Sequence, residues 1–277
     1  MAQWVFECVN AKIRVRILIE EVIVVKIQLL RHATLIITIN EKRILVDPMF
    51  SPRGVMPPIQ NSPNPQQNPL VEIPIEIDLQ KDIDGVLLTH IHRDHLDEAA
   101  IKTLPLDKPI LCQPEDESKL KEVGFLNLYP VHDELGWEEI MIKRTGAEHG
   151  TGEIAAQMAP VSGYVLKREG EPSLYIAGDS IYCEEVSRVL AMDQPKIIVL
   201  NAGGARFNVG DPITMTAEDV IKVCHEAPTA KVIAVHMDAI NHCIESRADL
   251  RTRLQKEGLL KQVLIPMDGE VIRLSSV

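Results

Sequence analysis

One short run constrains this chain of 277 residues more than any other feature: His90, His92, Asp94 and His95 lie within six positions. The run directly follows the apolar segment 86–88, which we expect to be a short buried strand. Side chains two positions apart on an extended backbone project to the same side, so His90 and His92 can bind one metal ion. Where the chain turns into a helix, Asp94 and His95 point differently and can bind a second ion. The alternative is a surface cluster or a strand-end cap, although imidazoles this close repel one another when protonated.

A centre for two ions needs more donors than one motif offers, and they must come from other strand ends. His149 lies in a glycine-rich turn, Asp179 follows a predicted strand through Gly178, and His236 ends the predicted strand 231–235. Each of these residues alone is as easily structural. Together with the histidine run they predict one metal centre.

A hairpin and a proline-rich segment precede the histidine run in the sequence. The predicted strands 34–39 and 43–46 form a hairpin that ends at Asp47 and Pro48, which places a carboxylate at a strand end. Residues 51–69 then contain six prolines among Asn and Gln, too many for a helix or an inner strand. We expect a long irregular loop that forms a lid or rim.

Strands come first and in pairs, and helices come mostly later. This order predicts an α+β fold, with two sheets and helices outside them. The last two helices begin with capping-box patterns, Thr216 with Asp219 and Ser246 with Asp249. Besides the segments above, strands are expected at 26–30, 126–131, 138–144, 163–168, 173–177, 197–200, 262–265 and 270–274, and helices at 97–104, from Pro114 to Gly124, and at 184–192, 216–225 and 246–257.

We expect one domain at residues 25–277, preceded by an N-terminal extension at 1–24. The extension is either an additional strand or helix or a misassigned start. Residues 13–30 are apolar-rich but contain five charged side chains, which a membrane span would not tolerate. The pattern of a signal peptide is also missing. The sequence therefore predicts no membrane span.

The charge balance and the cysteines limit the partners and the compartment. Forty acidic and 29 basic residues give a net charge of -11, which disfavours nucleic acid and favours a small-molecule substrate. The five cysteines are widely spaced and never form a C-x-x-C pair, so neither a disulfide framework nor a zinc cage is expected. We therefore expect a cytoplasmic protein.

The order of these residues resembles the five-motif pattern of the metallo-β-lactamase-fold hydrolases over about residues 26–240. The resemblance implies a four-layer αβ/βα sandwich with two divalent metal ions at one edge of the paired sheets, zinc or manganese being the expected ions. It implies that His90, His92 and His149 hold one ion, that Asp94, His95 and His236 hold the other, that Asp179 bridges them, and that Asp47 lies behind and orients the histidine loop.

Within that superfamily, segments 30–34, 44–48 and 175–180 look most like the branch of L-ascorbate-6-phosphate lactonase and the N-acyl-phosphatidylethanolamine phospholipase D relatives. One departure is Arg31 before His32, where many relatives carry a glycine. By analogy with the lactonase branch, a homo-oligomer is possible.

The implied activity is hydrolysis of a small-molecule ester, lactone or phosphoester bond by a metal-bound hydroxide. The alternatives are a phosphodiesterase or nuclease of the same fold, and a non-catalytic or redox metal-binding protein. Catalytic candidates are Asp94 and, for protonating the leaving group, His242 and His32, although either histidine can equally be a loop residue in water. Asn201, Arg206 and Asn208 are candidates for binding a substrate phosphate or carboxylate, although turn chemistry explains their glycine-rich loop equally well.

Overall fold

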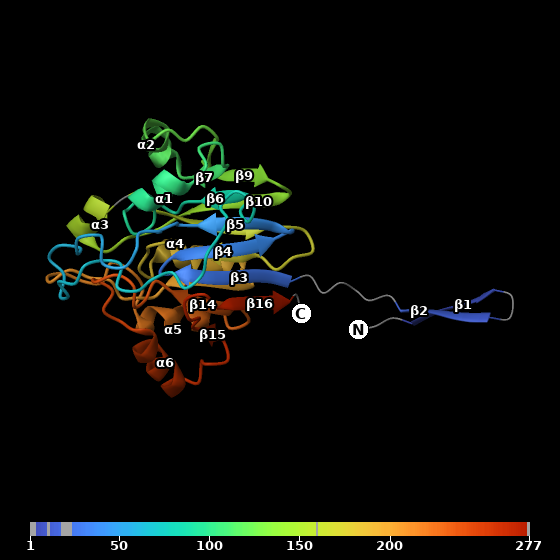
Figure 1. The fold of residues 1–277 in the computed structure, drawn as a ribbon. Helices are drawn as coiled ribbons and strands as arrows, with labels where there is room; N and C mark the ends of the chain where they lie inside the picture. Colours follow the sequence, from blue (N-terminus) through green and yellow to red (C-terminus); the bar gives the residue numbers. More distant parts are fainter. Residues whose placement is uncertain (1–3, 10–11, 18–23, 159, 276–277) are drawn as a thin grey trace.

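A computed structural model describes residues 4–9, 12–17, 24–158 and 160–275 of the chain, and Figure 1 shows its two large sheets stacked face to face. The first sheet has the strand order β16-β3-β4-β5-β6-β7-β8. Its strands are β3 (Val24–Arg31), β4 (Thr34–Ile39), β5 (Lys42–Val46), β6 (Gly85–Leu87), β7 (Ile110–Cys112), β8 (Leu128–Pro130) and β16 (Val271–Ser275).

The second sheet has the order β15-β14-β13-β12-β11-β10-β9. Its strands are β9 (Glu134–Trp137), β10 (Ile140–Gly146), β11 (Ser162–Lys167), β12 (Leu174–Ile176), β13 (Ile197–Asn201), β14 (Lys231–Val235) and β15 (Val263–Leu264). Each sheet is antiparallel over one part and parallel over the other.

Three apolar cores make the layers. The core between the sheets includes Ile37, Tyr164 and Val199. A second core packs the outer face of the second sheet against α4 (Glu184–Asp193), α5 (Ala217–Glu226) and α6 (Arg247–Lys256). A third packs the first sheet against α1 (Glu98–Thr103) and α2 (Glu117–Glu122). The expected α+β four-layer sandwich is confirmed.

Local sequence signals place most elements correctly. Both predicted capping boxes form, with the hydroxyls of Thr216 and Ser246 accepting from the backbone N–H of Asp219 and Asp249. The helix expected from Pro114 starts as a 3-10 turn, η1 (Pro114–Asp116), before α2.

The sequence pattern misses three elements. Strand β7 has only three residues, too few for a period to show. Strand β9 carries Glu134 and an interior glycine, neither typical of a strand. Helix α3 (Gly152–Met158) has no buried side chain, so it lacks an apolar stripe to reveal it.

The N-terminal extension contains β1 (Trp4–Val9) and β2 (Lys12–Ile17), which pair antiparallel in a separate two-stranded sheet. The domain boundary at residue 25 stays a prediction, and β3 begins at Val24. Among the described residues, no helix has the length and apolar character needed to cross a membrane.

Strand directions bring the predicted ligands to one edge of the sandwich. Strands β3, β5 and β6 of the first sheet run in one direction, and β10, β12, β13 and β14 of the second share a direction too. Asp47 and His90 follow the carboxyl ends of β5 and β6, and His149, Asp179 and His236 follow those of β10, β12 and β14. These ends are far apart in sequence and adjacent in space because the sheets are stacked.

Candidate metal centre

All seven predicted ligands meet in one cluster. Their ligand atoms form overlapping groups, within each of which the atoms lie no more than 4.8 Å apart. The groups are His90, His92 and His149; His90, His95 and Asp179; and His32, Asp94, His95 and His236. All of these side chains are buried except His92, which is half-buried.

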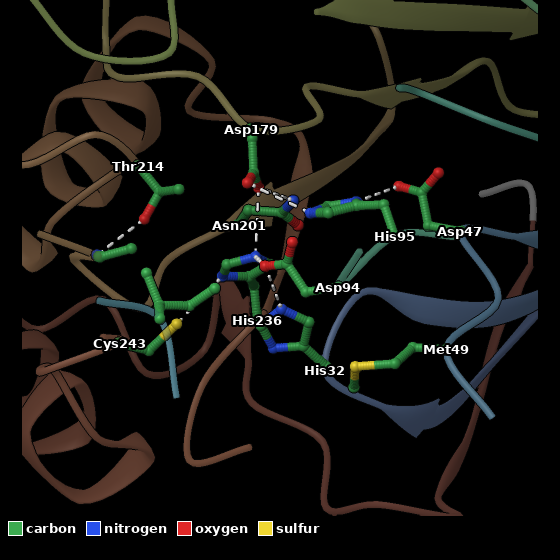
Figure 2. A network of polar contacts seen from close by, with 12 residues as sticks. His32, Asp47, Met49, Asp94, His95, Asp179, Asn201, Thr214, His236 and Cys243 are labelled. Atoms are coloured by element: carbon green, nitrogen blue, oxygen red, sulfur yellow. Dashed lines mark hydrogen bonds and ion pairs between the residues drawn. The ribbon is translucent and has the colours of Figure 1, made fainter. Parts of the chain in front are cut away.

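Asp179 directs its carboxylate toward His95 and His236 (Figure 2). Its Oδ2 is 3.2 Å from His95 Nε2 and 3.4 Å from His149 Nε2, and its Oδ1 is 3.3 Å from His236 Nε2. One carboxylate therefore faces histidines from both halves of the predicted ligand set, with a different oxygen toward His149 and His236. The amide of Asn201 at the end of β13 donates to Oδ1 at 2.6 Å and holds this orientation.

His32 is a member of the cluster that the sequence suggests only as an acid. It lies in the tight turn between β3 and β4, where its φ is +60°, and its side chain is fully buried. Its Nε2 is 3.4 Å from Asp94 Oδ2, and its ring centroid is 3.6 Å from that of His236. This placement makes His32 a potential ligand and leaves it no access to bulk water for proton exchange.

Asp47 supports the histidine run from behind. One oxygen accepts from the backbone N–H of Thr89 at 2.8 Å, and the other accepts from the Thr89 hydroxyl at 2.7 Å and lies 2.8 Å from His95 Nδ1. Thr89 in turn lies 3.0 Å from His90 Nδ1. A carboxylate on Nδ1 favours the tautomer in which Nε2 carries the lone pair, and this is the tautomer that can bind a metal ion through Nε2.

Replacing Asp47 by asparagine is expected to weaken metal binding by about 10- to 100-fold, as loss of such supporting partners does. An amide can still accept from the Thr89 backbone, but its NH₂ group opposes the N–H of His95. Titration against a competing chelator measures the change. Asp193→Asn is the matched control, because that carboxylate pairs with Lys143 and Lys167 at the end of α4. Unchanged affinity in Asp47→Asn would contradict the assignment.

Two other histidines are oriented through Nδ1. His149 Nδ1 lies 2.7 Å from the carbonyl oxygen of Ile213, so it must donate, and Nε2 is left free to bind. His236 Nδ1 lies 3.4 Å from the sulfur of Cys243 (Figure 2). In both residues the atom turned toward Asp179 is Nε2.

Burial keeps several imidazoles neutral, the form that binds metal. It lowers the pKa of His236 to about 3 and that of His32 to about 4. Burial, reinforced by repulsion from His95, also lowers the pKa of His90 well below its usual value. His95 differs: burial opposes its charge, but the carboxylates of Asp179 and Asp47 outweigh burial and raise its pKa. Without a cation, part of the charge in the cluster must be balanced by protons.

The cluster fits a metal centre by its own chemistry. The Nε2 atoms of His90, His95 and His236 are buried and have no hydrogen-bond partner among the described residues. Buried polar atoms are almost always satisfied, so three orphaned nitrogens that surround one carboxylate need a common partner. Imidazole and carboxylate donors suit zinc, manganese and iron.

Two glycines allow these loops to approach. Gly178 has a φ of +67°, and a Cβ on it would lie 2.7 Å from the carbonyl oxygen of Ser162. A Cβ on Gly203 would lie 2.1 Å from the carbonyl oxygen of His236. Side chains at these positions would displace the loops that carry Asp179 and His236.

The remaining candidates take different places. His242 is buried, and its ring centroid is 6.5 Å from that of Phe207. The sequence suggests Asn201 as a substrate contact, but its amide is committed to Asp179. Arg206 is half-buried and Asn208 exposed, both in the loop after β13.

Sequence reasoning misses Asn241, which fastens the proline-rich loop. Its side-chain oxygen accepts from the backbone N–H of Ile59 at 2.9 Å and from the Asn68 amide at 2.8 Å. Its own amide donates to Ser62 and to the Asn64 carbonyl. The expected irregular loop at 51–69 is confirmed, its role as a lid or rim stays a prediction, and Asn241 ties the loop to the segment that carries His236 and His242. In the sequence, Asn241 stands out only because it precedes His242. That position does not indicate that its side chain binds the loop 51–69.

Comparison with known proteins gives consistent matches. Residues 42–237 match the family model described as the beta-lactamase superfamily domain. The chain is 36% identical over 246 residues to the UPF0173 protein YddR of Bacillus subtilis, covering 87% of this chain and 96% of that protein. A possible metal-dependent hydrolase from Veillonella parvula has a TM-score of 0.87 at 31% identity, with 90% of this chain and 99% of that chain covered. An isothiocyanate hydrolase from Delia radicum gut bacteria has a TM-score of 0.87 at 34% identity, with coverages of 91% and 100%.

Proposed function

The chain belongs to the UPF0173 family of the β-lactamase superfamily and is a metal-dependent hydrolase, and from this premise we propose that it cleaves a small, uncharged electrophile at a dinuclear His/Asp centre. The observation that carries the proposal is the position of Asp179 between the His149 and His236 sides of the cluster. His90, His92 and His149 would hold one ion, and Asp94, His95 and His236 the other, with Asp179 shared. His32 is close enough to Asp94 to join the second set.

When bound, two divalent ions supply a hydroxide nucleophile near neutral pH and polarise the scissile bond. The residues around the ions would orient the ligand side chains and keep bulk water out. Asn201 and Asp47 fix the orientation of Asp179 and His95. The loop 51–69 is fastened beside His242, because the backbone N–H of Asn241 donates to the side-chain oxygen of Asn68.

We assign His242 the role of a neutral hydrogen-bond donor. Burial lowers its pKa to about 4, so its ring is uncharged at pH 7, and its Nδ1 has no partner among the described residues. A neutral imidazole N–H can stabilise negative charge that develops on the substrate. This role replaces that of a charged acid, for which the folded pKa is too low.

His242→Phe is expected to lower kcat by about 10²- to 10³-fold, the usual cost of losing one such donor. Metal content should stay unchanged because His242 is outside the ligand groups. His242→Gln keeps a donor and should recover part of the loss. Exposed His225 on α5 gives the matched control, His225→Gln. The measurements are kcat and metal content for each variant. A kcat in His242→Phe equal to that of His225→Gln would refute the donor role of His242.

Carboxylic esters and lactones are the substrates proposed first. The solved isothiocyanate hydrolase supports a second candidate, because its likeness extends over nearly the whole chain. An isothiocyanate, R–N=C=S, also offers an electrophilic carbon; adding one water and breaking the C–N bond gives the amine and carbonyl sulfide. Phosphoesters and the L-ascorbate-6-phosphate lactonase branch remain predictions. The net charge of -11 supports a small-molecule substrate in place of nucleic acid.

A substrate panel tests the proposal. Protein loaded with zinc or with manganese is assayed on a lactone, an alkyl ester, an alkyl isothiocyanate, a phosphodiester and a phosphomonoester, with and without chelator. Chelator-sensitive hydrolysis of an uncharged class is expected. Turnover of the phosphodiester alone would favour the phosphodiesterase alternative, and no turnover of any class would overturn the proposed function.

A further inference from the structure

A pocket of about 380 Å³ opens beside the metal centre, a volume typical of small-molecule sites. It lies between helix α3, the loop after β13 and the proline-rich loop. Four of its lining residues are apolar and three carry uncharged amides: Ile154, Met158, Phe207 and Val209, and Asn61, Gln157 and Asn208. We will call it the side pocket.

One wall of the side pocket is built on His149. Helix α3 starts three residues after this histidine, and Ile154 Cγ2 lies 3.2 Å from where a Cβ on Gly150 would be. Ile213 Cγ2 packs at 3.0 Å from the same point, and the carbonyl of Ile213 binds His149 Nδ1. Ile154 therefore packs against the backbone next to a predicted ligand.

The opposite wall is built on His242. The Phe207 ring faces the His242 ring at 6.5 Å, and the backbone N–H of Arg206 donates to the His242 carbonyl at 3.0 Å. Asn208 closes the rim by donating its backbone N–H to the carbonyl of Asn61 at 2.6 Å. The side pocket is thus bordered by Ile154, which packs next to His149, and by Phe207, which lies near His242.

The lining of the side pocket contains no charged side chain. A carboxylate, phosphate or ammonium group that entered it would lose hydration without gaining a partner, which is costly. Apolar walls instead favour alkyl or aryl groups, and the exposed Val209 at the rim is 85% accessible and available to be covered.

We propose that the side pocket binds the non-reacting, uncharged alkyl or aryl arm of the substrate and that it sets specificity by the length of this arm. The inference rests on the proposed function, because it places the electrophilic carbon between His149 and His242. The arm then lies against Ile154 and Phe207. Selectivity among substrate arms comes from apolar contact. The three amide side chains hydrogen-bond water at the rim of the side pocket without adding charge.

A homologous series of alkyl esters and alkyl isothiocyanates, from methyl to hexyl, tests whether the side pocket binds the alkyl arm of the substrate. In the wild-type protein kcat/KM is expected to rise roughly three- to fourfold per methylene until the pocket is full. Ile154→Trp fills the pocket and should flatten this rise. Gln157→Lys should favour an arm tipped with a carboxylate by about two- to fivefold. The control is Met192→Ala on α4, an exposed apolar side chain that does not line the side pocket, which should leave the rise unchanged.

Binding without turnover separates this inference from the proposed function. Saturation-transfer NMR is recorded on chelated protein with hexan-1-ol, hexanoate and hexylammonium. A signal from hexan-1-ol alone is expected, absent in Ile154→Trp and present in Met192→Ala. If this pattern appears while no substrate is hydrolysed, the proposed function fails and the pocket assignment stands. Hydrolysis with no dependence on arm length, or equal binding of all three probes, would overturn the pocket assignment.

Discussion

Asp179→Asn is expected to abolish hydrolysis, lowering kcat/KM by at least about 10⁴-fold, because the nucleophile is available near neutral pH only while the ions are held. The substitution keeps the size of the side chain but removes the negative charge that faces His95, His149 and His236. An amide also turns an NH₂ group toward Asn201 or toward a ligand nitrogen. Bound metal should fall in the same measurement.

The decisive comparison is with Asp193→Asn, which removes a carboxylate of the same chain outside the cluster. Circular dichroism should show both variants folded, because the polar contacts of Asp179 within the described part of the chain are with histidines of the cluster and with Asn201. Full metal content and turnover in Asp179→Asn would mean that this carboxylate does not bridge the ions.

Chelation is expected to lower the melting temperature by roughly 8–16 °C for each ion lost, as well as to stop turnover. Each ion that binds only the folded chain, present at about 1,000 times its dissociation constant, contributes about 4 kcal/mol to the free energy of unfolding. Each kcal/mol corresponds to about 2–4 °C in a chain of this size class. Without ions, the Nε2 atoms of His90, His95 and His236 stay buried with no hydrogen-bond partner among the residues that the structure describes.

Differential scanning calorimetry with and without chelator measures this effect. Asp179→Asn serves as the internal control, since a chain that has already lost its ions should shift little on chelation. A wild-type melting temperature that ignores chelator, in protein shown to contain metal, would contradict the coupling of binding to stability.

The parts of the fold that the sequence predicts are those with strong local signals. The capping boxes at Thr216 and Ser246 locate two helices because each box satisfies backbone donors within one turn. The predicted ligands meet because each follows the carboxyl end of a strand, and strands β6, β10, β12 and β14 all end at the same edge of the stacked sheets. Helix α3 is not predicted from the sequence because none of its side chains is buried, so its sequence shows no apolar stripe.

The rest of the site depends on contacts between residues distant in sequence. His32 joins Asp94 across 62 positions, and Asn241 binds Asn68 across 173. No local pattern encodes such pairs, since they follow from how two sheets stack. The side pocket is likewise made by helix α3 and two loops, with Ile154, Phe207 and Asn61 contributing from different parts of the chain. Loop shape of this kind carries specificity and is not readable from periodicity.

The most direct test of the account is the metal content of the purified chain, determined by elemental analysis after reconstitution with zinc and with manganese. A dinuclear centre predicts two equivalents per chain in the wild-type protein and clearly fewer in Asp179→Asn, because that carboxylate would be shared by both ions. A wild-type chain that retains no metal after reconstitution, or that binds two equivalents equally well without Asp179, would contradict the dinuclear centre.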